Sequence, residues 1–400
     1  MLFAEPSATA WFTSTCKRRS KRPSFSLQKA TFWNVKHDLL DCKTQPFKTP
    51  AKAYRQSGHM RFYFKSMSNM SQITCFSLKS TGKCPYYGEK NLILPQKDKK
   101  EINANIMAES IYHLLRFSLK LLSYIPFRLL YIISDGMFYL LYYVIRYRRA
   151  IVRKNLTESF PDKNLHEIIH IEKKFYHFFM DMLLESCKLA SMSQETIRRR
   201  MAFKNVEAVN SFLSSGKSVA VYLGHYGNWE WVSSMPLWLE KNTISAQIYH
   251  KLSNQSMDRL MLHIRERMGA VSVDMHKTAR YITTLAAEHK VCTIGFIADQ
   301  SPKKRDAHYY LHFLNHYVPA LTGTEKIIKH YGFEAFYLSV RRTRRGFYEA
   351  EFIKMHDNPR ELDDFMLTDM YFQHLECAIR QQPELYLWSH KRFRAAKKDL

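Results

Sequence analysis

The order of hydrophobic and polar positions changes along the chain, and beyond residue 217 two patterns alternate. Short apolar runs rich in β-branched residues predict buried strands, and longer runs with apolar residues at helical spacing predict amphipathic helices. The predicted strands cover residues 219–223, 244–249, 270–273, 291–298, 334–340 and 348–353. The predicted helices cover residues 229–239, 255–268, 278–289, 324–331 and 361–380. This alternation predicts an α/β domain over residues 151–400, with a central, mostly parallel sheet flanked by helices.

The most apolar and aromatic part of the chain is the segment 111–147. Its core, 119–145, is longer than the roughly 20 residues that a membrane-spanning helix needs. Charges, a proline and a glycine interrupt it: Lys120, Arg128, Asp135, Pro126 and Gly136. Because charges at bilayer depth are costly and a basic run follows, the pattern predicts an N-terminal helical membrane anchor, 107–150, that lies in the interface. A single spanning helix and a helical hairpin in the core are the alternatives. Either membrane interpretation places the following domain in the cytoplasm.

The leader, residues 1–106, shows no sustained helical or strand period and no signal peptide. Its composition predicts a disordered segment. An alternative is that translation begins at Met107, in which case mass spectrometry of the native protein finds no peptides from residues 1–100. The basic run at 17–22 is of the kind found in nuclear signals and nucleic-acid tails. Because no nucleic-acid-binding fold is recognisable, we expect no nucleic-acid partner.

The composition says more about the partners that the chain binds than about the reaction that it catalyses. The formal net charge of +25 over 400 residues favours an anionic partner such as an acidic protein, a phosphorylated substrate or an anionic membrane. The seven cysteines are odd in number and lack paired spacing, which predicts neither a disulfide framework nor a zinc site. The glycine-rich loops that bind nucleotide phosphates are absent from the sequence.

Candidate chemistry is concentrated in the stretch 218–231, where an apolar strand gives way to Gly-His-Tyr-Gly-Asn-Trp-Glu. Asn228 is a good N-cap for a helix that begins at Trp229, so His225 lies at the corner and Glu230 in the first turn. On one continuous helix, residues five apart point about 140° apart, whereas a corner lets them meet. We therefore expect Glu230 to accept a hydrogen bond from one imidazole N–H, which fixes the tautomer and leaves the other nitrogen as a base. A buried structural histidine beside a helix-start glutamate is the alternative.

This His-x4-Glu element resembles the signature of the bacterial lipid A late acyltransferases. Six further segments resemble the same family in the same order, namely 148–161, 172–185, 264–270, 297–302, 318–324 and 385–394. The resemblance covers residues 107–400. The extra leader departs from the family pattern, as does Ser301-Pro302, which replaces a further aspartate found in some members. The second departure leaves the substrate open.

The resemblance implies His225 and Glu230 as catalytic residues. It also implies the substrate-binding residues Asn228, Arg265, Arg280, Asp299, Gln300 and Thr322. Neither a metal nor a cofactor is expected. A role for the C-terminal segment 385–394 does not follow from the sequence.

The function implied is transfer of a fatty acyl chain from an acyl carrier protein thioester to a hydroxyl of a lipid A precursor. This step belongs to lipopolysaccharide biosynthesis at the cytoplasmic face of the bacterial inner membrane. Two alternatives are an acyltransferase of the same fold that acts on another glycolipid or a lysophospholipid, and a non-catalytic, membrane-docked lipid-binding protein. Acyl chain length, acceptor position and oligomeric state do not follow from the sequence.

Overall fold

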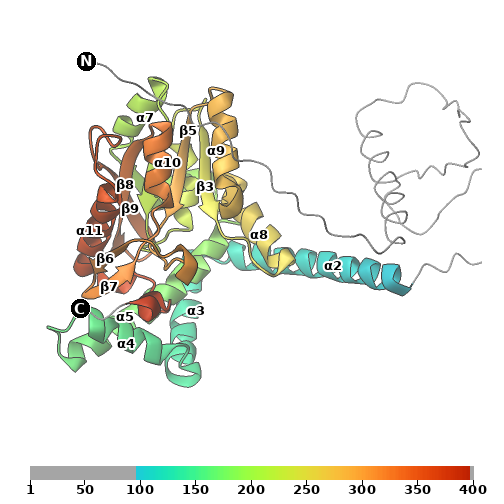
Figure 1. Cartoon of the computed structure of the whole chain (residues 1–400). Coiled ribbons are helices and arrows are strands. Elements are labelled where there is room, and N and C mark those ends of the chain that lie inside the picture. The colour runs from blue at the N-terminus through green and yellow to red at the C-terminus, as the bar shows by residue number, and fades with distance from the viewer. Residues whose placement is uncertain (1–95, 397–400) are drawn as a thin grey trace, which may run out of the picture. The chain divides into compact units, whose positions relative to one another are not determined.

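The structure, a computed structural model, describes residues 96–396 (Figure 1). The predicted leader therefore lies outside the described residues except for its last part. That part, residues 96–106, already belongs to the helix α2 (Gln96–Tyr124), so the predicted boundary at residue 107 falls inside a helix. Translation from Met107 stays a prediction.

A seven-stranded sheet forms the centre of the domain, in the strand order β1-β9-β8-β2-β5-β3-β4. The strands are β1 (Met201–Lys204), β2 (Val219–Leu223), β3 (Ile244–Tyr249), β4 (Val271–Asp274), β5 (Cys292–Ile297), β8 (Glu334–Arg344) and β9 (Phe347–Lys354). All neighbouring strands are parallel except the β8–β9 hairpin. The predicted α/β fold with a mostly parallel sheet is confirmed. All five residues of β2 are buried, which is typical of a central strand covered on both faces.

Strands that carry long apolar runs agree with the prediction to within one residue at most ends, but three short strands were not predicted. One is the edge strand β1, and the others pair as a separate hairpin, β6 (Tyr310–Phe313) with β7 (His316–Pro319). The hairpin turns at Leu314 and Asn315, which both adopt positive φ. A leucine is an unusual residue for that conformation, so the sequence carries a weak turn signal here.

Helices flank the sheet between the strands (Figure 1). They are α7 (Val206–Ser214), α8 (Gln255–Arg265), α9 (Thr278–Ala287), α10 (Gly323–Tyr331) and α11 (Met366–Gln381). The helix predicted at 229–239 is instead a 3-10 helix, η2 (Trp231–Leu237), with Pro236 inside it. The side chains of Ser233 and Ser234 donate to backbone carbonyls three residues earlier, which competes with regular α-helical bonding.

Before the sheet the chain forms a set of helices. After α2 come α3 (Phe127–Tyr139), the π-helix η1 (Leu140–Ile145), α4 (Arg149–Ser159), α5 (Leu165–Lys188) and α6 (Gln194–Arg200). Pro126 separates α2 from α3 as predicted, whereas Gly136 does not interrupt α3. The predicted amphipathic segment 172–185 lies within α5, whose inward face is buried. α5 and the loops after the strands together carry the site described below.

Candidate active site

His225 and Asp299 meet at one edge of the sheet. β2 and β5 are adjacent and parallel, so their carboxyl ends lie side by side. His225 follows the end of β2 by two residues, and Asp299 follows the end of β5 by two residues. His225 Nδ1 lies 2.8 Å from Asp299 Oδ1, and the backbone N–H of His225 donates to the same oxygen at 3.1 Å. Loops at the carboxyl ends of parallel strands are the usual position of active sites in such sheets.

The imidazole is oriented with one nitrogen inward and one outward. The Asp299 carboxylate is only 3% exposed and accepts at Nδ1, whereas the His225 side chain keeps 20% of its surface exposed. A carboxylate at Nδ1 holds the proton there, so Nε2 carries the lone pair. Gln300 Nε2 lies 3.3 Å from His225 Nε2, and the Trp229 ring packs edge-on against the imidazole. Nδ1 thus faces the carboxylate, and Nε2, beside the Gln300 amide, is the nitrogen that can act as a base.

Electrostatics around the pair favour a tight His–Asp interaction. Burial lowers the pKa of His225, but the Asp299 carboxylate outweighs this effect, and the pKa of His225 is raised from its ordinary value. Burial raises the pKa of Asp299, but the nearby His225 outweighs it, and the pKa of that carboxyl is lowered. Asp299 is therefore ionised at neutral pH and stabilises positive charge on the imidazole.

The predicted contact between Glu230 and the imidazole of His225 is not formed. Both of its carboxylate oxygens accept from Arg265, at 2.8 Å from Nε and 2.6 Å from Nη2. Arg265 is the last residue of α8, which places its guanidinium against Glu230. Asp299 occupies Nδ1 instead. The expected partner of His225 is thus corrected from Glu230 to Asp299, and the catalytic role of Glu230 stays a prediction.

The other predicted substrate-binding residues fall in different surroundings. Asn228 is fully buried; its Nδ2 donates to Glu185 at 2.8 Å and its Oδ1 accepts from the backbone of Trp231. Arg280 is exposed on α9, and Thr322 is half-buried just before α10. Among the described residues, no contact joins either of these two to His225. The structure thus brings together His225, Asp299 and Gln300, with the Glu230–Arg265 pair beside them.

In the described part of the chain, no group of three or more histidine, cysteine or acidic side chains has a geometry that could hold a metal ion.

A family model described as bacterial lipid A biosynthesis acyltransferase matches residues 97–395. The chain belongs to this family. The match begins inside α2, ten residues before the start that the sequence resemblance indicates. No curated protein matches the chain.

Glu185 of this lipid A-type acyltransferase supports the corner on which His225 lies. It is a fully buried residue of α5 that accepts hydrogen bonds from Tyr131, Asn228 and Tyr348 at 2.7–2.9 Å. Burial raises the pKa of this carboxyl. Sequence analysis did not single it out. The available signal was an acidic residue on the apolar face of a predicted amphipathic helix, which usually means a satisfied buried carboxyl.

The C-terminal segment of the acyltransferase forms part of the site. The Leu385 carbonyl accepts from Gly227 N at 3.0 Å, and Leu387 N donates to the His225 carbonyl at 3.1 Å. Tyr226 and Tyr386 form an antiparallel bridge between them. Segment 385–394, to which the sequence assigned no role, therefore fixes the backbone of the His225 loop.

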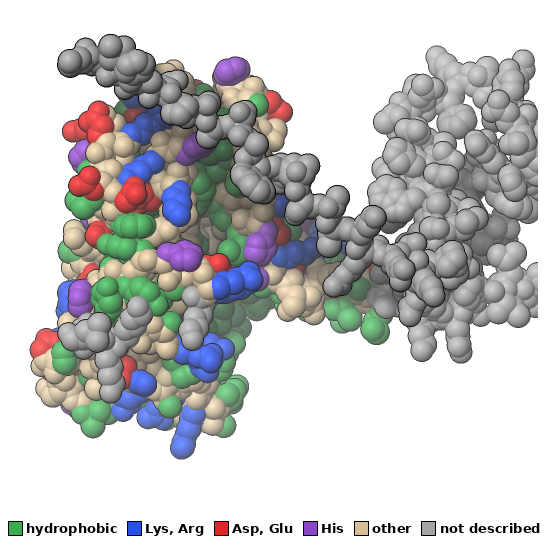
Figure 2. Space-filling view, in the orientation of Figure 1, with side chains coloured by type: hydrophobic (Ala, Val, Ile, Leu, Met, Phe, Trp, Pro, Cys, Tyr) green, Lys and Arg blue, Asp and Glu red, His purple; other side chains and the backbone are tan. Residues whose placement is uncertain are grey.

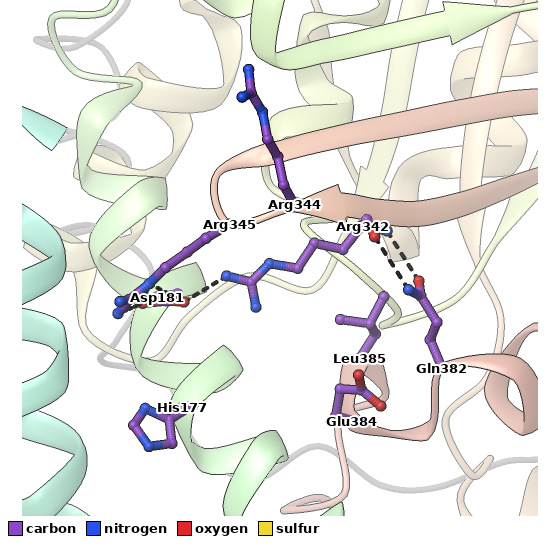
Figure 3. A pocket seen from close by; sticks show the side chains of 8 residues that line it. All are labelled: His177, Asp181, Arg342, Arg344, Arg345, Gln382, Glu384 and Leu385. Atoms are coloured by element: carbon purple, nitrogen blue, oxygen red, sulfur yellow. Dashed lines mark hydrogen bonds and ion pairs between the residues drawn. The ribbon is translucent and has the colours of Figure 1, made fainter. Parts of the chain in front are cut away.

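A polar cavity of about 400 Å³ lies beside the start of this C-terminal segment (Figure 3). Residues lining it include Gln382, Glu384 and Leu385. Figure 3 shows Arg342 and Arg345 converging on Asp181, while Arg344 points away from them. The Asp181 carboxylate binds both guanidinium groups, and Arg345 also binds Asp135 of α3. These charged side chains form ion pairs with one another, so the cluster joins α3 and α5 to the β8–β9 hairpin.

Proposed function

We propose that this acyltransferase moves a fatty acyl chain from an acyl carrier protein thioester to a hydroxyl of a lipid A precursor, with His225 as the general base. The observation that carries the proposal is the His225 Nδ1–Asp299 contact of 2.8 Å, which leaves Nε2, beside the Gln300 amide, as the basic nitrogen at the carboxyl edge of the sheet. A hydroxyl is a weak nucleophile at neutral pH and needs a positioned base.

The proposed reaction has two proton transfers. His225 Nε2 accepts the proton of the acceptor hydroxyl while its oxygen attacks the thioester carbonyl carbon. Asp299 stabilises the imidazolium that forms. When the tetrahedral intermediate collapses, the carbon–sulfur bond breaks and the leaving thiolate takes the proton from His225, which gives an ester and a free thiol. Gln300, whose amide lies against Nε2, is proposed to help place the reacting hydroxyl.

Arg265 is proposed to supply positive charge beside the reacting centre. Its side chain is held by two hydrogen bonds to Glu230, which fixes the direction of the guanidinium. A fixed cation at this position favours the oxyanion of the intermediate or a phosphate of the acceptor. Glu230 then acts through Arg265 rather than through His225. The basic composition of the chain fits an acidic carrier protein and a phosphorylated lipid.

We also propose that α2, α3 and η1 dock the enzyme on the cytoplasmic face of the bacterial inner membrane. These elements expose large apolar side chains, among them Leu114, Phe117, Leu121, Tyr124, Leu129, Ile132, Tyr139, Val144 and Ile145. In Figure 2 hydrophobic side chains lie at the surface along α2. Exposed apolar areas of this extent are typical of interaction sites.

One segment of this surface, Phe127–Ile145, is long and apolar enough to cross a membrane by length and composition. The opposite face of α3 argues for an interfacial position, because Ser134 and Asp135 are bonded to Asp181 and Arg345 of the α/β domain. Washing membranes with alkaline carbonate tests this proposal. An interfacial anchor is released by the wash, and retention of the protein in the pellet would instead support a spanning helix.

The catalytic proposal is tested with purified protein, acyl carrier protein thioester and a lipid A precursor. Wild-type protein is expected to form the acylated lipid, and His225→Ala is expected to form none while keeping its unfolding midpoint. His166→Ala is the matched control, since His166 is an exposed histidine near the start of α5. Normal turnover by His225→Ala would remove the base assignment. Lipid mass spectrometry of a deletion strain identifies the acceptor, because a missing acyl chain on another lipid would replace lipid A as the substrate.

A further inference from the structure

Arg392 is a buried cation that acts electrostatically on Asp299, the partner of the proposed base. It lies in the short C-terminal 3-10 helix η7 (Arg392–Ala395) and is only 1% exposed. Its Nη1 donates to Ser301 Oγ at 2.9 Å, and its Nη2 donates to the Pro319 carbonyl at 3.0 Å. The Ser301 hydroxyl in turn donates to the Arg392 backbone carbonyl at 2.7 Å. The side chain thus ties the loop after β5, which carries Asp299, to the C-terminal segment.

The charge of Arg392 is not neutralised by a direct ion pair. Among the described residues no carboxylate lies within ion-pair distance of its guanidinium, and its buried Nε has no hydrogen-bond partner there. The guanidinium lies instead near the rings of Phe313 and Phe372. A buried charge is costly unless an opposite charge compensates it. Asp299, which is also buried, is the acidic group on which Arg392 acts. The positive charge of Arg392 helps to lower the pKa of the Asp299 carboxyl.

We propose that Arg392 is a positioning residue that holds the loop of Asp299 so that the carboxylate faces His225, and whose buried positive charge favours that arrangement, an inference that rests on the proposed role of His225 as base. Two observations support it together. The hydrogen bonds to the Ser301 hydroxyl hold the side chain two residues beyond Asp299, and the guanidinium adds positive charge within the buried surroundings of that carboxylate. The proposal also gives segment 385–394 a second task, beyond fixing the His225 loop.

Other charged and titratable groups face the His225–Asp299 pair. Tyr371 and Tyr386 contribute hydroxyls near Asp299, as does Tyr337 of β8. Burial and the aspartate raise the pKa values of these three tyrosines, so they are neutral in the working pH range. The remaining groups are His390, whose pKa is lowered by burial, and the Glu230–Arg265 pair. Arg392 is therefore the cation that faces Asp299 from the C-terminal segment.

The test compares Arg392→Gln, which removes the charge, with Arg392→Lys, which keeps it. Removing a nearby positive charge increases the proton affinity of the coupled His–Asp pair. We expect the acid limb of the pH profile for acyl transfer to move up by about one pH unit in Arg392→Gln. In Arg392→Lys the midpoint stays in place, although turnover falls. Arg394→Gln is the control, because Arg394 is an exposed cation of the same short helix.

A second readout does not depend on activity. Diethyl pyrocarbonate modifies the unprotonated imidazole, so the pH dependence of His225 labelling, followed by peptide mass spectrometry, reports its protonation directly. The same upward shift is expected in Arg392→Gln. The apolar Arg392→Met makes the same comparison if the glutamine variant does not fold.

An unchanged labelling midpoint in the charge-removing variants, or an equal shift in Arg392→Lys, would overturn the inference. Failure of wild-type protein to transfer any acyl chain would instead refute the proposed function. The two failures are thus distinguishable.

Discussion

Replacing Asp299 by Asn tests the corrected partner of the proposed base. The substitution keeps the size of the side chain and removes the charge that faces His225 Nδ1 at 2.8 Å. An amide can donate to Nδ1 as well as accept from it, so the imidazole proton is free to move to Nε2. That tautomer has no lone pair on the reactive side.

The expected loss can be worked out from the contact. A hydrogen bond to a charged group is worth about 1.5–3 kcal/mol. If that energy is realised when the imidazolium forms, it corresponds to roughly one to two decades in rate. Population of the wrong tautomer lowers the rate further. In serine proteases, which use the same His–Asp pair, the equivalent change lowers kcat by about 10⁴-fold. We expect Asp299→Asn to lower kcat by about 10²–10⁴-fold.

The pH profile shows in which direction the pKa of His225 moves when Asp299 is replaced. The Asp299 carboxylate stabilises protonated His225 and raises its pKa, so its removal lowers that pKa. Because the base must be unprotonated, the acid limb of kcat/KM moves to lower pH as the plateau falls. Glu230→Gln is the matched control. Glu230 raises the pKa of His225 less than Asp299 does, and its own hydrogen bonds go to Arg265.

The assay is initial-rate acyl transfer from acyl carrier protein thioester across the range of about pH 5–9 in steps of about half a unit, which spans the ordinary histidine pKa. We expect Glu230→Gln to move the limb less than Asp299→Asn does, and to act mainly on the step that involves Arg265. A larger shift in Glu230→Gln, with nearly normal behaviour of Asp299→Asn, would refute the reasoning and restore Glu230 as the partner of His225.

Further predictions concern the supports of the site and are checked by chemical denaturation. Glu185→Ala leaves three donors, two of them buried, without their acceptor and should lower the free energy of unfolding by about 3 kcal/mol. Gly227→Ala should cost about 1–3 kcal/mol and much of the activity, because φ is +64° and the added Cβ would lie 2.6 Å from Val340 Cγ1. Gly136→Ala, with nothing within 4 Å of the new Cβ, should instead stabilise the helix by about 0.5–1 kcal/mol. Arg345→Gln breaks the ion pairs to α3 and α5 and should cost about 1–3 kcal/mol, with faster proteolysis around α3.

The strands of the sheet were predictable because their positions depend on local patterning. β2 and β3 have the predicted bounds, and β5 differs by one residue at each end. β2 and β5 are mostly apolar runs with β-branched residues, and burial on both faces produces that composition directly. β3 alternates apolar residues with Ser245 and Gln247. The segment around Pro236 was not predictable in the same way. Its apolar spacing is helical, but the proline and the serine side chains favour a 3-10 helix, and the pattern of apolar positions does not report that competition.

Part of the candidate site was also predictable. His225 lies where the strand-to-helix pattern places it, and Asp299 lies at the end of a predicted strand. The contact between them was not predicted, because it joins residues 74 positions apart. A motif read within a few residues favours the nearest carboxylate, Glu230. In this structure the carboxylate of Glu230 forms an ion pair with Arg265 at the end of α8.

The order of the strands explains why the distant carboxylate takes the place of the near one. β2 pairs with β5 and β8, neither of which neighbours it in the sequence. Every loop that follows a parallel strand opens at the same edge, so residues from separate segments converge there while residues of one loop diverge into different elements. His225 and Asp299 share that edge, whereas Glu230 is the N-cap of the next element, η2. A catalytic partner on this fold is therefore better sought at the carboxyl end of a neighbouring strand than a few residues along the chain.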